Sequence, residues 1–326
     1  MKVHPGGRSF RPFFVTSLAL LLAASSPERH DGPISLRNLF PLFYGVLTLE
    51  PRRAPVQPGW QVNSAYSLEV VDDRNDNWTM VMDMETVFIE PQYTRPISPG
   101  WYASYRLPVY FSSGGLFDNF VLHYHEWVGF RVGPRAQRPF NQYTYRIVHN
   151  GQVIESSTGR GPAFGDLDLS ILRDLRHGSR ASLTAEFAVE LPTGNAAKGF
   201  GNKTVDYGVT LHGSYRTRRI AWHTSVGYFL PGRFGNVNTV DLHNFTAYSA
   251  AGEWYKSPLT SFVVQFSGFS NPFPSTSLDS IDEDPIELAV VLRRRVRQND
   301  WSLGFTENLT SGESPDINFI ASVHWR

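Results

Sequence analysis

The chain has 326 residues, with 30 basic and 30 acidic side chains, no cysteine and 14% aromatic residues. The absence of cysteine excludes disulfides, thiolate metal sites and thiol nucleophiles. A formal net charge of zero gives no general electrostatic attraction to nucleic acid, so we expect no nucleic-acid partner. The hydrophobic fraction of 41% is too high for a disordered chain.

Residues 1–25 have the pattern of a secretory signal peptide. The start is basic, Phe13–Ala24 is apolar, and Ala23–Ser25 offers a small-residue cleavage site. A retained membrane anchor is the alternative, but the apolar stretch is shorter than the roughly 18 to 20 residues that a membrane-spanning helix needs. We therefore expect export and cleavage near residue 25. The next segment, residues 26–59, is expected to be either a periplasmic extension or a plug inside a barrel.

From Trp60 to the end of the chain, apolar and polar residues alternate in one segment after another. In Ala181–Leu191 the alternation continues for the whole segment. A period of two is typical of strands with one apolar and one polar face. Twelve segments are predicted as strands: Trp60–Asp72, Trp78–Glu90, Gly100–Tyr110, Gly165–Leu175, Arg180–Leu191, Asp206–Tyr215, Ile220–Leu230, Asn244–Tyr255, Leu259–Ser270, Pro285–Arg294, Asp300–Leu309 and Ile317–Arg326.

The predicted connections alternate between short and long. Arg176–Ser179 and Arg216–Arg219 are short, whereas Phe111–Phe164 and Pro192–Val205 are long. This alternation is typical of outer-membrane barrels, which have short periplasmic turns and long extracellular loops. A secreted soluble all-β protein is the alternative, but its fold gives no reason for such alternation. We therefore predict an all-β fold, a closed antiparallel transmembrane β-barrel of about 12 strands over residues 60–326.

Features at the ends of the predicted strands agree with insertion in the outer membrane of a Gram-negative bacterium. Seven tryptophans lie at or near strand ends, where an aromatic girdle would contact lipids and lipopolysaccharide: Trp60, Trp78, Trp101, Trp222, Trp254, Trp301 and Trp325. The last strand ends on Trp325 followed by Arg326, which is similar to the strand that the barrel-assembly machinery recognises. Basic residues in the short turns and acidic residues in the long loops favour periplasmic termini.

Several short motifs resemble a known family in their order and spacing. They are Gly32-Pro33-Ile34, Arg37-Asn38-Leu39, Asp83-Met84-Glu85, Gly114-Gly115-Leu116-Phe117-Asp118 followed by His123 and His125, and Pro192-Thr193-Gly194. Together they resemble an uncharacterised family of Gram-negative outer-membrane β-barrel proteins, catalogued as a domain of unknown function. The resemblance implies a membrane-inserted barrel and supplies no activity.

The long loop between the third and fourth strands is predicted to contain a short amphipathic helix and a hairpin. Apolar residues from Phe117 to Val128 recur at helical spacing, with Asp118, His123, His125 and Glu126 on the other side. The helix would narrow the barrel mouth, and the hairpin Tyr143–Ser157 would turn at Asn150-Gly151. His123 and His125 point apart on a helix, so a polar surface is favoured over a metal site.

Acidic residues gather on the polar faces of the fourth to sixth predicted strands. A turn at Arg176–Ser179 would place Asp166 near Glu190, Asp168 near Glu186, and Asp206 beside Glu190. Such a cluster needs compensation. The alternatives are basic side chains reaching into the lumen, a divalent cation at the acidic rim, or neutral carboxyl groups. The basic candidates are Arg106, Lys198 and Lys203.

These features favour a channel or transporter for small solutes with an acidic lumen and a loop constriction, and they require no cofactor. The alternative is a non-conducting barrel that acts as a lipid-modifying enzyme or as a surface structural or adhesion protein. His223 and Ser225 resemble the His-x-Ser of the outer-membrane phospholipase. By alternation, however, both point into the lumen and away from lipid, and no orienting third group is evident, so enzymatic activity is disfavoured.

Overall fold

The computed structural model describes residues 32–115, 117, 119, 123, 138–157, 160–310 and 317–325. All of these residues belong to one compact unit, Asp31–Arg326. The predicted signal peptide lies outside the described residues and stays a prediction. Among the described residues, no helix has the length and hydropathy that crossing a bilayer requires.

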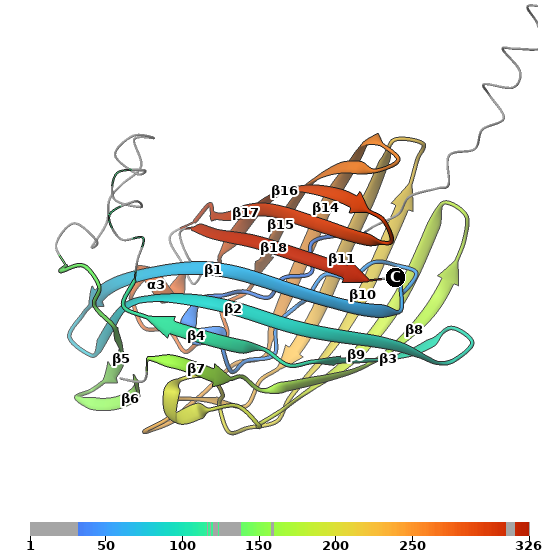
Figure 1. Cartoon of the computed structure of the whole chain (residues 1–326). Helices are drawn as coiled ribbons and strands as arrows, with labels where there is room; N and C mark the ends of the chain where they lie inside the picture. The colour runs from blue at the N-terminus through green and yellow to red at the C-terminus, as the bar shows by residue number, and fades with distance from the viewer. Residues whose placement is uncertain are drawn as a thin grey trace, which may run out of the picture. The chain divides into compact units, whose positions relative to one another are not determined.

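A closed sheet forms the wall of the molecule (Figure 1). Its strands are β1 (Gly59–Arg74), β2 (Trp78–Ser98), β3 (Trp101–Arg106), β4 (Val109–Ser113), β7 (Gly161–Phe164), β8 (Leu167–His177), β9 (Ala181–Leu191), β10 (Asp206–Arg216), β11 (Ile220–Leu230), β14 (Phe245–Ser257), β15 (Thr260–Phe269), β16 (Ile286–Val296), β17 (Asn299–Asn308) and β18 (Ile317–Trp325). β3 and β4 are successive parts of one wall strand, as are β7 and β8, so the wall has 12 strands. β1 pairs antiparallel with both β2 and β18, which closes the barrel. The predicted twelve-stranded antiparallel barrel is confirmed.

The two ends of the barrel differ. At one end, which we call the turn end, two or three residues join β2 to β3, β8 to β9, β10 to β11, β14 to β15, and β16 to β17. The opposite end, the loop end, carries the long connections. These connections contain the remaining elements: β5 (Thr144–His149), β6 (Gln152–Ser157), β12 (Arg233–Phe234), β13 (Val240–Asp241), the 3₁₀ helix η3 (Ala196–Lys198) and the helix α3 (Asp279–Asp282).

The longest strands project beyond the others at the loop end. β2 has 21 residues, whereas a tilted strand needs only about 9–11 to cross a membrane. The first residues of β2 pair with β5 rather than with the wall strand β4. β5 and β6 form the expected hairpin, in which Asn150 and Gly151 have positive φ angles of 49° and 76°. These are the angles that a tight two-residue hairpin turn requires.

The outer face of the wall is apolar. In β10, for example, Tyr207, Val209 and Leu211 are exposed, and the residues between them are buried. Six tryptophans, 39–53% exposed, ring the barrel at the turn end: Trp60, Trp101, Trp222, Trp254, Trp301 and Trp325. Trp78 lies at the loop end and is buried against His149, so it is not part of the predicted girdle. An apolar band with an aromatic rim matches a membrane-embedded barrel.

Residues 32–58, which we call the inner segment, run inside the barrel (Figure 1). The segment begins at the turn end, where Gly32 contacts Glu253 of β14. It reaches the loop end at a 3₁₀ helix, η1 (Pro41–Phe43), and returns to the turn end, where Val56 contacts Asp174 of β8. β1 then starts at Gly59. The interior of the barrel is therefore filled by the residues that precede its first strand.

Candidate functional site in the barrel interior

The six lumen residues expected from sequence all lie inside the barrel and are buried, at 0–7% exposure. They are Arg106, Asp166, Asp168, Glu186, Glu190 and Asp206. Asp166 lies just before β8; for the other five, side chains alternate along the strand, so the less buried neighbours of these residues face outward. The pattern of alternation was therefore sufficient to orient them.

The predicted pairing of these carboxylates between β8 and β9 is wrong. Asp168 lies opposite Glu190, whereas Glu186 lies opposite Leu172. Asp166 precedes β8, and its carboxylate accepts hydrogen bonds from the backbone N–H groups of Gly194 and Asn202. The register differs because β8 continues to His177, with a bulge after Asp174, so the turn comes later in the chain than predicted. The predicted contact between Asp206 and Glu190 is present, since these residues are register partners of β10 and β9.

Arginines compensate the carboxylates, and two of them belong to the inner segment. Arg37 lies 3.2 Å from both Asp168 and Glu190. Arg52 lies 2.9 Å from Glu186. Arg106, from the wall, contacts Asp168 at 3.3 Å and also pairs with Glu50 of the inner segment. Removing one partner from such a buried pair is strongly destabilising, so these contacts hold the inner segment to the wall.

The two lysines considered as counterions do not reach the carboxylates. The Lys198 ammonium group donates to the carbonyl oxygens of Arg160 and Pro162. The Lys203 ammonium group donates to the carbonyl of Asn236. Both lysines lie in the long loop between β9 and β10, and their carbonyl partners lie in other loop-end connections or, for Pro162, in β7. Their basic groups therefore stabilise contacts between loops rather than the interior.

A chain of hydrogen bonds through a histidine, which we call a histidine relay, connects the inner segment to β9, β10 and β11. The backbone N–H of Arg52 donates to Nδ1 of His212 at 3.3 Å, and the Ser225 hydroxyl lies 2.9 Å from the same nitrogen. His212 Nε2 lies 2.9 Å from Glu186. Because Nδ1 accepts the Arg52 hydrogen bond, the proton of a neutral ring sits on Nε2 and is donated to Glu186. His212 is fully buried.

A second histidine relay lies closer to the turn end, at the next pair of inward-facing residues of β10 and β11. The hydroxyl of Ser214 accepts the backbone N–H of Ala54 at 3.2 Å and contacts His223 Nδ1 at 2.9 Å. His223 Nε2 lies 3.7 Å from Glu253. His223 and Ser225, the residues considered for lipid hydrolysis, thus belong to different relays, and both face the interior. The groups have the composition of a hydrolytic triad, but they hold peptide N–H groups of the inner segment.

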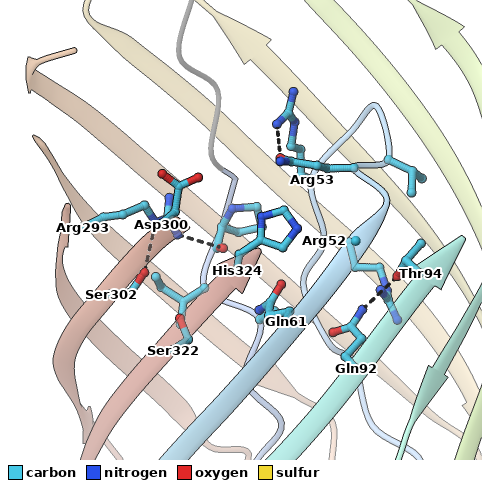
Figure 2. A pocket seen from close by; sticks show the side chains of 16 residues that line it. Arg52, Arg53, Gln61, Gln92, Thr94, Arg293, Asp300, Ser302, Ser322 and His324 are labelled. Atoms are coloured by element: carbon cyan, nitrogen blue, oxygen red, sulfur yellow. Dashed lines mark hydrogen bonds between the residues drawn. The ribbon is translucent and has the colours of Figure 1, made fainter. Parts of the chain in front are cut away.

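A polar hollow opens at the turn end between the inner segment and β1, β2, β16, β17 and β18 (Figure 2). Its empty volume is about 800 Å³ including the open mouth. The inner segment contributes Arg52, Arg53 and Gln57, and the wall contributes residues such as Gln92 and Arg293. The Arg293 side chain donates to Glu253 at 2.8 Å and to the Gly32 carbonyl at 2.9 Å. A smaller hollow, about 240 Å³, shares four lining residues with the first: Ile34, Ser35, Ser302 and Ser322.

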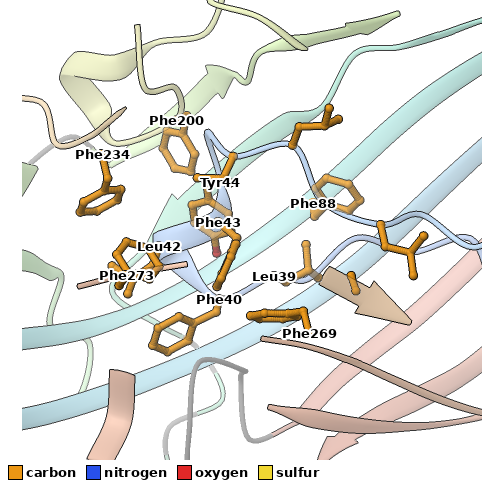
Figure 3. Close-up of a cluster of buried hydrophobic side chains, with 14 of the residues drawn as sticks. Leu39, Phe40, Leu42, Phe43, Tyr44, Phe88, Phe200, Phe234, Phe269 and Phe273 are labelled. Atoms are coloured by element: carbon orange, nitrogen blue, oxygen red, sulfur yellow. The ribbon is translucent and has the colours of Figure 1, made fainter. Parts of the chain in front are cut away.

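At the loop end, the inner segment packs into an aromatic cluster (Figure 3). The ring of Phe43 lies edge-on to Phe269 and Phe273, with centroids 4.7 and 5.7 Å away. Tyr44 stacks on Phe200, with centroids 5.2 Å apart. The cluster also draws on the long loops, which supply Phe200, Phe234 and Phe273. Side chains of the inner segment from Leu39 to Leu47 are at most 2% exposed where they join this cluster.

Most of the predicted loop helix falls outside the described residues, including Asp118, His125 and Glu126. His123 is described, and its Nδ1 lies 2.7 Å from the carbonyl of Asn119. Within the described part of the chain, no group of three or more histidine, aspartate or glutamate side chains is arranged to hold a metal ion.

A family model for proteins of unknown function, DUF3187, matches residues 14–326. The chain belongs to the DUF3187 family. The family resemblance noted in the sequence motifs is therefore confirmed. No curated protein matches this DUF3187 chain in sequence.

Solved structures similar to this DUF3187 protein are outer-membrane barrels. An outer-membrane channel from Pseudomonas putida F1 is 10% identical, over 83% of this chain and 97% of that chain, with a TM-score of 0.52. The NanC porin is 9% identical, over 82% and 99% of the two chains, with a TM-score of 0.48. The toluene transporter TodX of Pseudomonas putida is 9% identical, over 90% and 100%, with a TM-score of 0.44. At 10% identity, the similarity to the Pseudomonas putida F1 channel establishes an outer-membrane β-barrel fold alone.

Sequence reasoning missed the parts of the DUF3187 interior that the inner segment supplies. Arg37, Glu50 and Arg52 lie before the first regular strand, in a stretch without periodicity. His212 was also missed, although alternation in β10 directs it inward with Thr210 and Ser214. The inward-facing polar positions of β10 and β11 carry two histidines, and this pattern in the sequence could have indicated the relays.

Proposed function

We propose that this protein is a channel or transporter for small solutes whose interior is closed by the inner segment and opens when that segment moves. The observation that carries the proposal is that a polar hollow at the turn end lies beside a segment held by ion pairs, hydrogen bonds and apolar packing. The two hollows share lining residues and together follow the inner faces of β17, β18 and β1 from the turn end. Polar groups around the turn-end hollow are what a hydrophilic solute requires at an entrance.

The orientation that we propose places the turn end and both termini in the periplasm. The exposed apolar band would contact the outer membrane, with lipopolysaccharide around its outer half. β18 pairs with β1 over Trp60–Leu68 and ends at the exposed Trp325. This C-terminal strand supports recognition by the barrel-assembly machinery during insertion. The predicted signal peptide would supply export to that compartment.

The sequence favoured a channel with an acidic lumen, but in this proposal the acidic residues have a different role. Asp168, Glu186 and Glu190 each face an arginine, so they hold the inner segment rather than attract cations from solution. The constriction predicted for residues 117–126 would be a second narrowing, at the loop end. Current through a variant that lacks residues 117–137 would rise if this loop contributes to closure.

The decisive experiment tethers the inner segment to the wall. The chain contains no cysteine, so a pair introduced by Ala54→Cys and Ser214→Cys forms the only disulfide. These two positions touch, since the Ala54 N–H donates to the Ser214 hydroxyl at 3.2 Å. The refolded variant is placed in a planar bilayer, and single-channel current is recorded before and after reduction. We expect openings only in the reduced protein.

Ser214→Cys alone is the matched control, and its current should not respond to reductant. Equal current from the oxidised and reduced double variant would show that the inner segment does not gate the barrel. If wild type and both variants carry no current and release no small solute from liposomes, the channel proposal is wrong. A non-conducting structural barrel would then be the better account.

A further inference from the structure

We propose that the hollow at the turn end is a binding site for a small solute that carries one carboxylate and several hydroxyl groups, of which a hexuronic acid is the simplest example. The inference deepens the proposed function and rests on it for the route by which the solute arrives. The chemical class of the solute is inferred only from the residues that line the hollow.

The place of the hollow follows from how the inner segment is held. Arg52, Ala54 and Val56 are hydrogen-bonded to β10 and β8, on one side of the barrel. The opposite side, along β17, β18 and β1, is left open at the turn end. The hollow, about 800 Å³ with its open mouth included, is accessible to a small solute from the turn end.

The charge of the lining favours an anion. Three guanidinium groups line the hollow, those of Arg52, Arg53 and Arg293, against one carboxylate, Asp300. Figure 2 shows them on different sides of the space, Arg53 and Arg52 from the inner segment and Arg293 from β16. A guanidinium presents paired N–H donors that match the two oxygens of a carboxylate.

A single negative charge fits better than several. Arg52 lies 2.9 Å from Glu186, and Arg293 donates to Glu253 at 2.8 Å. Both carboxylates lie outside the lining, yet they offset part of the positive charge that the solute would meet. A polyanion would meet these carboxylates as well as Asp300, and like charges at short range repel.

Gln92 provides an independent sign of a ligand with hydroxyl groups. Its side chain is 5% exposed and faces the hollow, as Figure 2 shows. The amide nitrogen donates to Thr94 and Ser104, whereas its oxygen has no hydrogen-bond partner among the described residues. Buried polar atoms normally find a partner. A hydroxyl group both donates and accepts, so it can pair with either polar atom of this amide.

The rest of the lining has the same character. Side-chain amides and hydroxyls, each able to pair with a sugar hydroxyl, surround the space: Ser35, Gln57, Gln61, Thr94, Ser302 and Ser322. Apolar side chains are few in the hollow, with Ile34 and Val56 the largest. A purely hydrophobic solute would leave these polar groups without partners, which is costly.

Calorimetric titration of the full chain, refolded in detergent, tests the proposal with three probes: D-glucuronate, D-glucose and D-glucosamine. We expect glucuronate to bind at least about tenfold more tightly than glucose, since a charge-assisted hydrogen bond is worth about that factor or more. Glucosamine, which carries a positive charge, should bind most weakly. Equal binding of glucuronate and glucose would overturn the proposal, as would no heat from glucuronate at millimolar concentration.

Two variants locate the site. Arg53→Gln should weaken glucuronate binding by about ten- to hundredfold and leave glucose binding unchanged. Gln92→Leu should weaken both sugars, because it removes a hydroxyl partner. Arg233→Gln, on the exposed loop end, is the matched control and should bind as wild type does. Unchanged glucuronate affinity in Arg53→Gln and Gln92→Leu would place the binding elsewhere and overturn the assignment. Heat-modifiable migration in gels verifies that each variant is a folded barrel.

The experiments distinguish failure of the binding site from failure of the channel. If the tethered variant binds glucuronate as wild type does and conducts after reduction, both proposals stand. If current depends on the tether but glucuronate does not bind, the channel stands and the site is refuted. If glucuronate binds and no variant conducts, the site stands and the channel is refuted.

Discussion

The inner segment is held by opposite kinds of chemistry at its two levels in the barrel. Toward the turn end its backbone and Arg52 meet charged and hydrogen-bonding side chains of the wall. At the loop end its aromatic and aliphatic side chains meet other apolar side chains, several of them from long loops. Apolar packing is tolerant of small shifts, whereas a buried ion pair depends on its geometry. We infer that the apolar packing at the loop end fills the barrel, whereas the polar contacts toward the turn end fix the position of the inner segment along the wall.

The largest expected effect comes from removing a buried cation. Arg37→Met leaves Asp168 and Glu190 without the guanidinium that lies 3.2 Å from each. The free energy needed to release the inner segment from the wall, which we call the opening free energy, should fall by about 3–5 kcal/mol. Amide hydrogen exchange of residues 32–58 in detergent micelles measures this quantity.

The matched control for this prediction is Arg233→Met, which removes an exposed pair with Asp241. It should change the opening free energy by less than about 1 kcal/mol. Similar exchange in Arg37→Met and wild type would show that the ion pairs do not hold the segment.

A smaller effect is expected where a neutral hydrogen bond is lost. Ser214→Ala removes the acceptor of the Ala54 N–H, which is buried, so opening should become easier by about 1–3 kcal/mol. The change should be confined to the residues next to Ala54, whereas Arg37→Met should affect the whole segment. Exchange resolved by peptide separates the two patterns, and a uniform increase in Ser214→Ala would contradict this view.

The aromatic level should respond less to a conservative change. Phe43→Leu keeps an apolar side chain but loses the edge contacts with Phe269 and Phe273, so we expect a cost of about 1–2 kcal/mol. Phe187→Leu, on the exposed outer face, is the control and should cost under about 0.5 kcal/mol. A larger cost for Phe43→Leu than for Arg37→Met would show that apolar packing holds the segment more strongly than this ion pairing does.

The smallest effect concerns a loop outside the membrane. Asp282 of α3 accepts hydrogen bonds from the backbone N–H groups of Thr276 and Ser277 at 2.9 and 2.7 Å. Burial raises the pKa of Asp282, but these hydrogen bonds and those of the Thr276 and Ser275 hydroxyls outweigh it, so the pKa falls below its usual value.

The sign of the pH dependence follows from that shift. The stabilisation of the loop by ionised Asp282 is complete above the usual carboxyl pKa and is lost as pH falls through the lower pKa of the folded loop. Amide exchange of residues 275–284 should therefore be constant between pH 5 and 7, after correction for intrinsic rates, and faster near pH 3. Asp282→Asn should weaken the loop and remove this pH dependence. The same acid response in Asp282→Asn would assign it to another group.

The wall could be predicted from sequence because alternation is a local signal. Each residue of β10 or β14 reveals its side of the sheet through its neighbours, and this also placed Glu186 and His223 inside. Register was harder to predict. The turn between β8 and β9 comes later than predicted and a bulge follows Asp174, and together these give Asp168 the partner Glu190 instead of the predicted Glu186.

The contents of the interior could not be predicted in the same way. The inner segment is irregular apart from η1, so its position depends on pairings between distant residues, such as Arg37 with Asp168 and Ile34 with Gln265. Such pairings leave no periodic trace in the sequence. The counterions were therefore sought among Lys198, Lys203 and Arg106, and only the last of these lies in the interior.

The inner segment enters and leaves the barrel at the same end. Gly32 and Gly59 both lie at the turn end, and η1 is the far point of the excursion. A segment with this course can be withdrawn as a loop, without passing through the barrel and without separating β1 from β18. The wall can then keep all of its backbone hydrogen bonds while its contents change, and no strand edge is exposed to lipid, where an unpaired edge is costly. In the proposed channel, permeability and mechanical integrity thus reside in different parts of one chain.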